Sequence, residues 1–267
     1  MSVEELGNEG QKRAQIDLHK KVAKDYHRSR RHLIGTRLFN DYWDAEIQTW
    51  LPKDRRLRVL DNMCGTGIFL GSLSARYSFV VGADISFEML SQCDRDTRAP
   101  LKGLLCADTE RLPFMSNSFD IVNIRGAIHH VHPLGRALEE IRRVMKPGGL
   151  LILSEPCDDF VLVRKMREMM YTSMDGFGEG EKTFRSSELL EDLQRAGFSI
   201  QKTKRFGFIA YTLLGYPDVV PALEFIHHLP FARLLSRGLI GIDRLLAKTP
   251  GLKNWSLIVF VAGQRPA

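Results

Sequence analysis

The sequence has few cysteines and no long apolar run. No apolar run approaches the roughly 20 residues that a membrane-spanning helix requires. The opening MSVEELGNEGQKR lacks the apolar core of a signal peptide, so we expect a cytoplasmic protein. The cysteines include no C-x-x-C pair, and two of them lie in apolar runs, which predicts reduced thiols and no metal site. The four are Cys64, Cys93, Cys106 and Cys157.

Repeats, low-complexity segments and nucleic-acid-binding strips are also missing. The 267 residues, 44% hydrophobic and 26% charged, have the composition of a globular protein and are enough for one large domain. The net charge is +6, and much of the basic excess lies in residues 12–32. A solvated basic helix and attraction to acidic partners both account for this segment. Basic and aromatic side chains do not interleave as in single-strand binders, so we expect no nucleic-acid partner.

Short β-rich runs alternate with helical patterns from residue 57 onward. Strands are expected at 57–61, 78–84, 102–108, 119–124 and 149–155, and helices at 68–76, 86–97, 134–145 and 186–196. Strands that alternate with helices imply right-handed crossovers and a parallel sheet covered on both faces. We therefore predict an α/β fold with a doubly wound, mostly parallel sheet.

The flanking segments depart from this rhythm. Residues 11–50 are expected to be mostly helical, residues 157–174 helical, and residues 175–182 a loop. A strand at 198–208 faces a last, antiparallel strand at 255–264, which completes seven strands. About 45 apolar, helical residues separate these two strands, far more than a hairpin loop contains. The predicted domains are an N-terminal helical lid (1–55), a core (56–207 and 254–267) and a helical cap (208–253).

A glycine-rich turn follows the first predicted strand, in VLDNMCGTGIFLG (59–71). Gly65 and Gly67 leave the backbone bare, so that a ligand can approach it closely. A dinucleotide fingerprint would add an acid about 20 residues later, and Asp84 lies at nearly that distance. The third glycine of that fingerprint is misplaced, however. The turn alone therefore leaves two cofactor classes open.

The ordered set of motifs separates them. VLDNMCGTG, VVGADIS, the run CADTERLPFMSNSFDIVNIRGAIHHV and ALEEIRRVMKPGGLLILSEP follow one another between residues 57 and 155. In this order they resemble the Rossmann-like S-adenosylmethionine-dependent methyltransferases, in particular the small-molecule group that includes quinone-ring methylases. One departure is Met63, where the family usually has a small residue. A methionine there crowds the end of the pocket that takes the methionine carboxylate.

The resemblance assigns cofactor contacts at the ends of the first two strands. The loop of Gly65, Thr66 and Gly67 is expected to lie against the adenosyl and methionine parts of S-adenosylmethionine. Asp84 can accept hydrogen bonds from both ribose hydroxyls. Asp61 is expected to hold the loop and to face the methionine ammonium.

The resemblance assigns further contacts to later segments and to the N-terminal helix. Asp108 is placed to accept from the adenine amine, with the Thr109 amide toward the ring and Ile85 on the adenine face. Arg125 is expected to present its backbone carbonyl to the methionine moiety. Tyr26 resembles the tyrosine that closes over the cofactor in relatives.

A base is needed if the methyl acceptor is an oxygen, and histidine suits that role at neutral pH. AIHHVHP contains His129, His130 and His132 directly after the fourth strand. We expect His129 or His130 to be the base, with Glu155 as a further candidate. In the family this histidine pair often only orients a helix, which is the alternative.

The cap contains an amphipathic helix in FARLLSRGLIGIDRLLAK (231–248). Its four cations fall on one face at about 100° per residue, and an apolar face adjoins them. We expect the apolar face to pack on the core and the basic face to be solvated; the alternative is peripheral contact with anionic lipid. The cations are Arg233, Arg237, Arg244 and Lys248, and the apolar residues are Leu234, Leu235, Ile242, Leu245 and Leu246.

These observations predict an S-adenosylmethionine-dependent methyltransferase that acts on a small, hydrophobic or lipid-linked acceptor. O-methylation is favoured, with C-methylation of a quinone-like ring as the alternative. The chain has NIRG where base-methylating enzymes commonly have an (N/D)-P-P-(Y/F) motif. An NAD(P)-dependent oxidoreductase and a non-catalytic cofactor-binding protein are the alternatives from other classes, and the sequence leaves the oligomeric state open.

Overall fold

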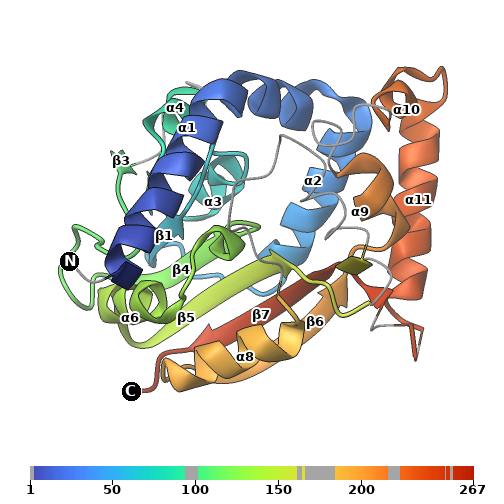
Figure 1. Cartoon of the computed structure of the whole chain (residues 1–267). Helices are drawn as coiled ribbons and strands as arrows, with labels where there is room; N and C mark the ends of the chain where they lie inside the picture. Colours follow the sequence, from blue (N-terminus) through green and yellow to red (C-terminus); the bar gives the residue numbers. More distant parts are fainter. Residues whose placement is uncertain are drawn as a thin grey trace.

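A seven-stranded sheet runs through the centre of the molecule, a computed structural model that describes residues 3–93, 102–160, 164–165, 184–215, 223–249, 251–252 and 255–267 (Figure 1). The strand order is β3-β2-β1-β4-β5-β7-β6. β1 to β5 are mutually parallel, and β7 is antiparallel to both β5 and β6. The strands are β1 (Arg58–Asn62), β2 (Phe79–Asp84), β3 (Gly103–Cys106), β4 (Phe119–Arg125), β5 (Met145–Pro156), β6 (Ser199–Phe206) and β7 (Ile258–Gln264). The predicted α/β fold, with its antiparallel last strand, is confirmed.

Helices cover both faces of this sheet and extend beyond one end of it (Figure 1). Among the described residues, two helices precede the first strand and three more lie between β6 and β7. The described helices are α1 (Val3–His32), α2 (Ile34–Gln48), α3 (Leu70–Arg76), α4 (Phe87–Ser91), the 3-10 turn η1 (Ile128–His130), α6 (Gly135–Val144), α8 (Ser186–Arg195), α9 (Ile209–Leu214), α10 (Phe225–His228) and α11 (Ala232–Leu246). N-terminal helices and a helical insertion before the last strand are as expected.

Two apolar clusters lie on opposite faces of the sheet. Because side chains alternate along a strand, Val59 and Ile121 join the first cluster, whereas their neighbours Leu60 and Val122 join the second. Side chains of α2, α3 and α9 complete the first cluster, and side chains of α6 and α8 complete the second. The core therefore sits in two layers around a buried sheet. The division into lid, core and cap stays a prediction.

Several element boundaries differ from the sequence-based expectation: β7 begins at Ile258 rather than at 255, and the differences at β5 and α4 are larger. β5 begins at Met145, four residues early, and so includes the predicted K-P-G-G turn. The cause is pairing with the end of the chain: Gly148 N donates to Arg265 O (2.9 Å), and Arg265 N donates to Gly149 O (3.0 Å). In the expected helix 86–97, α4 ends at Ser91, and residues 94–97 lie outside the described residues.

The segment after β5 is described only in part. Cys157 pairs with Phe184 in an isolated parallel bridge, and residues 158–160 are not helical, so the helix predicted at 157–174 does not begin at 157. Most of the rest of that helix and the whole loop predicted at 175–182 lie outside the described residues. Across the described ranges, no helix is both long enough and apolar enough to cross a membrane. No disulfide joins any of the four cysteines.

The apolar face predicted for α11 does not pack on the core. Leu234, Leu235, Ile242 and Leu245 are exposed, and only Leu246 of that set is half-buried. The face that α11 buries instead contains small and polar residues together with one isoleucine: Ala232, Ser236, Ile240 and Asp243. The expectation of core packing was therefore wrong for four of the five residues.

Candidate cofactor site

The glycine-rich turn after β1 is tied to the acid that ends β2. Because β1 and β2 are parallel neighbours, their carboxyl ends meet at one edge of the sheet. Asp84 Oδ2 accepts a hydrogen bond from Gly65 N (2.7 Å), and Oδ1 accepts one from Ser86 N (2.9 Å). Burial raises the pKa of Asp84, although these two hydrogen bonds oppose the shift. The structure thus brings together the loop and the acid that the sequence singled out.

The turn uses its two glycines for different reasons. Gly65 has a φ of +53°, and a Cβ added there would meet no atom within 4 Å, so the loop faces open space at this point. Gly67 has a φ of +71°, and an added Cβ would come within 2.8 Å of Cys93 Sγ. Close packing inside the protein therefore accounts for Gly67, whereas Gly65 leaves room for a ligand.

Met63 also adopts a left-handed conformation, with a φ of 58°. This conformation is uncommon for residues other than glycine. The Met63 side chain is half-buried and packs against the second apolar cluster. Packing thus compensates for an unfavourable backbone at the position where the family usually has a small residue.

Buried polar atoms beside the loop lack hydrogen-bond partners among the described residues. Thr66 Oγ1 and Asn123 Oδ1 are both such atoms. The amide of Asn123 donates to Asp61 Oδ1 (2.7 Å), which leaves its own carbonyl oxygen unpaired. Because unpaired buried polar groups are costly, these two atoms fit a polar ligand at this edge.

Asp61 itself lies deep in the protein. Asp61 is 3% exposed, and burial raises its pKa to about 7. The hydrogen bond from Asn123 and the charge of Arg125 oppose this shift. Nearby Asp44 is affected in the same way, with a pKa raised to about 6 by burial.

Replacing Asp61 by asparagine should change how stability depends on pH. An acid whose pKa is higher in the folded state binds more protons there, so the free energy of unfolding falls as pH rises from about 4 to 7. The Asp61→Asn variant would keep an acceptor for Asn123 and lose this pH dependence. In urea unfolding without cofactor, the free energy of unfolding of the variant should rise relative to that of the wild type by on the order of 3 kcal/mol between about pH 4 and pH 8. Parallel pH profiles for the two proteins would contradict the assignment.

Asp108, the acid that follows β3, forms an ion pair with a lysine of α1. Lys12 Nζ donates to Asp108 Oδ2 (2.7 Å) and forms a second ion pair with Glu110. Burial lowers the pKa of Lys12, but the hydrogen bonds to both carboxylates outweigh it and raise the pKa overall. Asn62 Nδ2 donates to Thr109 Oγ1 (2.6 Å), which links the ends of β1 and the β3 loop.

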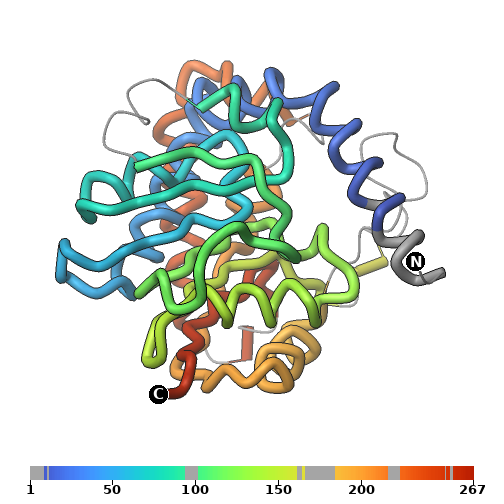
Figure 2. The backbone as a smooth tube through the Cα atoms, turned by 90° about the vertical axis from the view of Figure 1, so that its left-hand side faces the viewer, coloured from blue at the N-terminus to red at the C-terminus, as the bar shows by residue number. Residues whose placement is uncertain are grey.

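Only a short part of α1, around Lys12 and Gln15, contacts site residues in the described part of the chain. Figure 2 shows the helix running along one side of the strands. Beyond Lys12, Gln15 Nε2 lies 2.9 Å from His130 Nδ1. Tyr26 is about 21 Å further along the helix than Lys12, and the Arg30 guanidinium lies over its ring, 4.7 Å from the centroid. The predicted role of Tyr26 stays a prediction.

α2 anchors the carboxyl end of β4. Arg125, the last residue of β4, donates from its guanidinium to Asp44 Oδ1 (2.7 Å) and Asn40 Oδ1 (2.6 Å), and it lies over the Trp43 ring. Trp43 Nε1 donates to Ser154 Oγ of β5 (3.1 Å). The side chain of Arg125 therefore links α2 to the sheet, and the role predicted for its backbone carbonyl stays a prediction.

His129 and Glu155 form the clearest chemical pair at this edge. Glu155 is fully buried, and its Oε1 accepts hydrogen bonds from Ala127 N (2.8 Å) and Ile128 N (3.0 Å). Its Oε2 lies 2.8 Å from His129 Nδ1, and the His129 side chain is 14% exposed. The rings of His129 and His130 are in contact, with centroids 4.1 Å apart and planes tilted by 39°. Glu155 is thus enclosed by partners, whereas His129 reaches the surface of the site.

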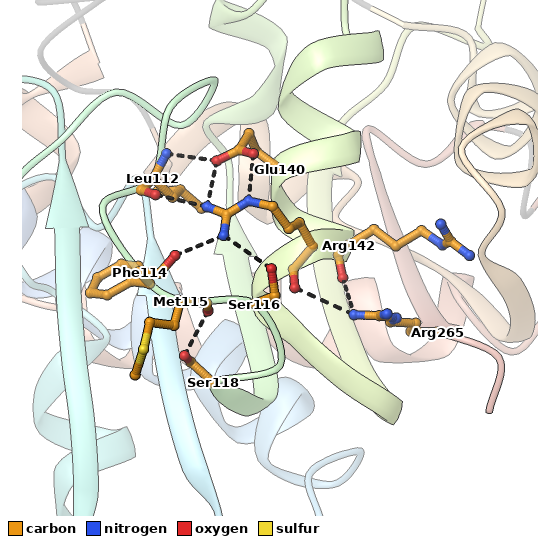
Figure 3. A network of polar contacts seen from close by, with 9 residues as sticks. Leu112, Phe114, Met115, Ser116, Ser118, Glu140, Arg142 and Arg265 are labelled. Carbon is orange, nitrogen blue, oxygen red and sulfur yellow. Dashed lines mark hydrogen bonds and ion pairs between the residues drawn. The ribbon is translucent and has the colours of Figure 1, made fainter.

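The segment LPFMSNSFD (112–120), which we call the connector because it leads to β4, is held by a network of polar contacts. Glu140 on α6 accepts from Leu112 N (3.0 Å) and binds Arg143, whose guanidinium donates to Leu112 O (2.9 Å) and Phe114 O (2.8 Å). Figure 3 shows these groups converging on the connector. Arg265 fastens the end of the chain to Arg142 O in the same region. This network fixes the loop that leads from Asp108 to β4.

Sequence reasoning missed the polar residues that reach the site from the two N-terminal helices. Asn40 and Asp44 lie on the same face of α2 as the core residue Trp43, and polar residues on an apolar face were the available signal. Lys12 and Gln15 had no such signal, because their partners lie 96 and 115 residues away.

Comparisons with known proteins agree with this geometry. Residues 60–153 match the family described as a methyltransferase domain. The chain is 30% identical over 162 residues to a demethylmenaquinone methyltransferase of Staphylococcus aureus strain MRSA252, an alignment that covers 59% of this chain and 67% of that protein. It is 35% identical over 124 residues to a malonyl-(acyl-carrier protein) O-methyltransferase of Legionella pneumophila, with 45% of this chain and 41% of that protein covered.

The fold comparison extends further along the chain. A methyltransferase structure from Thermotoga maritima, dependent on S-adenosylmethionine, superposes with a TM-score of 0.62 and 18% identity, covering 94% of this chain and 99% of that one. By sequence, the chain spans only about two fifths of the length of the Legionella relative. From its sheet, its glycine-rich turn and these matches, we conclude that the chain belongs to the Rossmann-like S-adenosylmethionine-dependent methyltransferases.

Proposed function

We propose that the protein transfers a methyl group from S-adenosylmethionine to an oxygen atom of a small, apolar or lipid-linked acceptor. The observation that carries the proposal is the pairing of His129 with Glu155 at the carboxyl edge of the sheet. The name of the Legionella relative also supports O-methylation. Membership of this family favours methyl transfer over nicotinamide chemistry.

The residues at the edge fit the cofactor. Open space at Gly65 and the unpaired Thr66 hydroxyl suit a ligand lying along the loop. The Asp84 carboxylate has further lone pairs for a diol such as ribose, and Asp108 has them for an adenine amine beside Lys12. Once bound, the cofactor would supply a methyl group activated by a sulfonium.

In our proposal, His129 moves the proton of the acceptor. Because the Glu155 carboxylate accepts a hydrogen bond from His129 Nδ1, Nδ1 carries the imidazole proton and Nε2 keeps its lone pair. Nε2 then takes the hydroxyl proton as the acceptor oxygen gains its methyl group. Glu155 is a positioning residue in this scheme, because its oxygens are occupied by Ala127, Ile128 and His129.

The second candidate is C-methylation of a quinone-like ring. It is favoured by the names of relatives such as the Staphylococcus aureus protein, of which this chain covers 67%. Loss of a ring proton also needs a base, so the same histidine would serve both reactions. We further propose a cytoplasmic location, which is consistent with four cysteines that form no disulfide.

Label transfer will test the proposal. The protein incubated with methyl-deuterated S-adenosylmethionine and a panel of phenols, carboxylic acids and quinols should yield an O-methylated product by mass spectrometry. Fragmentation distinguishes methyl on oxygen from methyl on carbon. Calorimetry with S-adenosylhomocysteine should show binding. Binding without turnover of any acceptor would favour a non-catalytic cofactor-binding protein, and the absence of binding would refute the proposal.

A further inference from the structure

α11 presents three distinct faces. The buried face is held by Asp243, whose carboxylate accepts from Phe208 N (2.8 Å) and Ala210 N (3.1 Å). The basic face lies beside it and covers about 60° of the helix circumference at about 100° per residue. It consists of Arg233, Arg237, Arg244 and Lys248, all exposed.

The third face is apolar and exposed, and we call it the α11 stripe. It covers about 100° of the helix circumference. Phe231 is 73%, Leu234 72% and Leu245 67% exposed. The full stripe is Phe231, Leu234, Leu235, Ile242 and Leu245, with Gly238 and Gly241 between them.

The roll of α11 is fixed, so the stripe cannot turn inward. Rotation to bury the leucines would expose Asp243 and break its hydrogen bonds to the beginning of α9. α10, which precedes α11, is held in turn by His227 Nδ1, which accepts from Gly35 N of α2 (3.1 Å). Phe225 and Leu229 of this neighbouring segment are also exposed and extend the apolar surface. Figure 1 places α10 and α11 together at one side of the molecule.

The charge next to the stripe indicates what covers it. Asp243 is the only acid in α11 and it is buried, so all the exposed charged side chains of this helix are cations. The chain as a whole has a net charge of +6. An apolar stripe beside a row of cations is the pattern of a helix that lies in the plane of a membrane interface with anionic headgroups. A contact between two copies through this stripe would bring both basic rows together, which repulsion opposes.

We propose that α11 docks the protein onto a membrane surface that has anionic headgroups. The apolar side chains of the stripe enter the interface, and Arg233, Arg237 and Lys248 contact phosphate groups at its edge. α2 lies between α11 and the candidate site: Arg244 lies over Tyr42, whereas Asn40 and Asp44 hold Arg125. The docking proposal is independent of the proposed function. The inference that docking brings the site to a lipid-linked methyl acceptor rests on the proposed function.

Vesicle flotation tests the docking. The whole chain should float with phosphatidylcholine vesicles that contain about 30% phosphatidylglycerol and remain unbound with phosphatidylcholine alone. The double variant Leu234→Glu, Leu245→Glu should lose about 100-fold in partition, and Arg233→Gln, Arg237→Gln about 25-fold. Met115→Glu, which changes a side chain that is 83% exposed on the connector, should float like the wild type.

Calorimetry with S-adenosylhomocysteine should give the same affinity for all these variants, which separates docking from cofactor binding. In the variant Leu234→Trp, the emission of the introduced indole should shift to the blue with anionic vesicles and be quenched by brominated lipid. The proposal is overturned if the wild type does not float, or if the glutamate pair floats equally well. A lipid-free dimer, found by light scattering and dissolved by the glutamate pair, would also overturn it, because the stripe would then belong to a second copy.

Discussion

Replacing Asp84 by alanine should weaken binding of S-adenosylhomocysteine roughly 100-fold. The estimate assumes that the carboxylate makes two charge-assisted hydrogen bonds to the ribose, of about 1.5 kcal/mol each. In the structure the same carboxylate accepts from Gly65 N and Ser86 N, so it orients the loop as well as offering lone pairs to a ligand. Isothermal titration calorimetry measures the loss directly.

Two further variants separate binding from folding. Asp84→Asn keeps one acceptor oxygen, so it should lose about tenfold and hold the loop more nearly in place. Asp120→Asn changes an acid at the opposite edge of the sheet, where it accepts from Arg58 N, and should leave the affinity unchanged. Thermal unfolding shows whether each variant is folded. A folded Asp84→Ala protein that binds within twofold of the wild type would remove Asp84 from the site.

The sequence was a good guide wherever the determinants are local. Alternating residues such as Val59 and Leu60 point to opposite faces of β1 and enter different clusters, as the period of a buried strand requires. The turn at Gly65 and the acid at Asp84 were found from the spacing and order of the motifs, and the structure brings them together because parallel neighbouring strands end at one edge. Their hydrogen bond follows from that topology.

The contacts that depend on packing could not be predicted in this way. The ion pair of Lys12 with Asp108 joins residues 96 positions apart, and no local pattern encodes it. The role of Gly67 depends on Cys93 Sγ, which only the folded chain brings near. For α11 the sequence showed an apolar and a basic face, but the buried hydrogen bonds of Asp243 decide which face turns inward. The hydrogen bonds of Asp243 to the start of α9 therefore decided the orientation of α11, although the hydrophobic pattern favoured another face.

Removing the imidazole of His129 should lower kcat for the acceptor identified by label transfer by about 10²- to 10⁴-fold, the range for loss of a general base. Cofactor affinity should stay within about threefold, because the loop and Asp84 are untouched. His130→Ala should cost less than about tenfold, since the ring nitrogen Nδ1 of His130 lies 2.9 Å from the side-chain amide of Gln15, whereas Nδ1 of His129 lies 2.8 Å from the Glu155 carboxylate that orients it. If kcat fell further in His130→Ala than in His129→Ala, His130 rather than His129 would be the base.

Glu155→Gln tests the pairing with almost no change in shape. The amide oxygen can still accept from Ala127 and Ile128, whereas the amide nitrogen would face His129 Nδ1 and donate to it. The imidazole proton would then reside on Nε2, and the lone pair needed to accept the acceptor's proton would be lost. We therefore expect kcat to fall nearly as far as in His129→Ala, and the rise of kcat/KM with pH that reports the histidine to disappear. A glutamine variant with normal kcat and an unchanged pH profile would show that Glu155 only supports the fold.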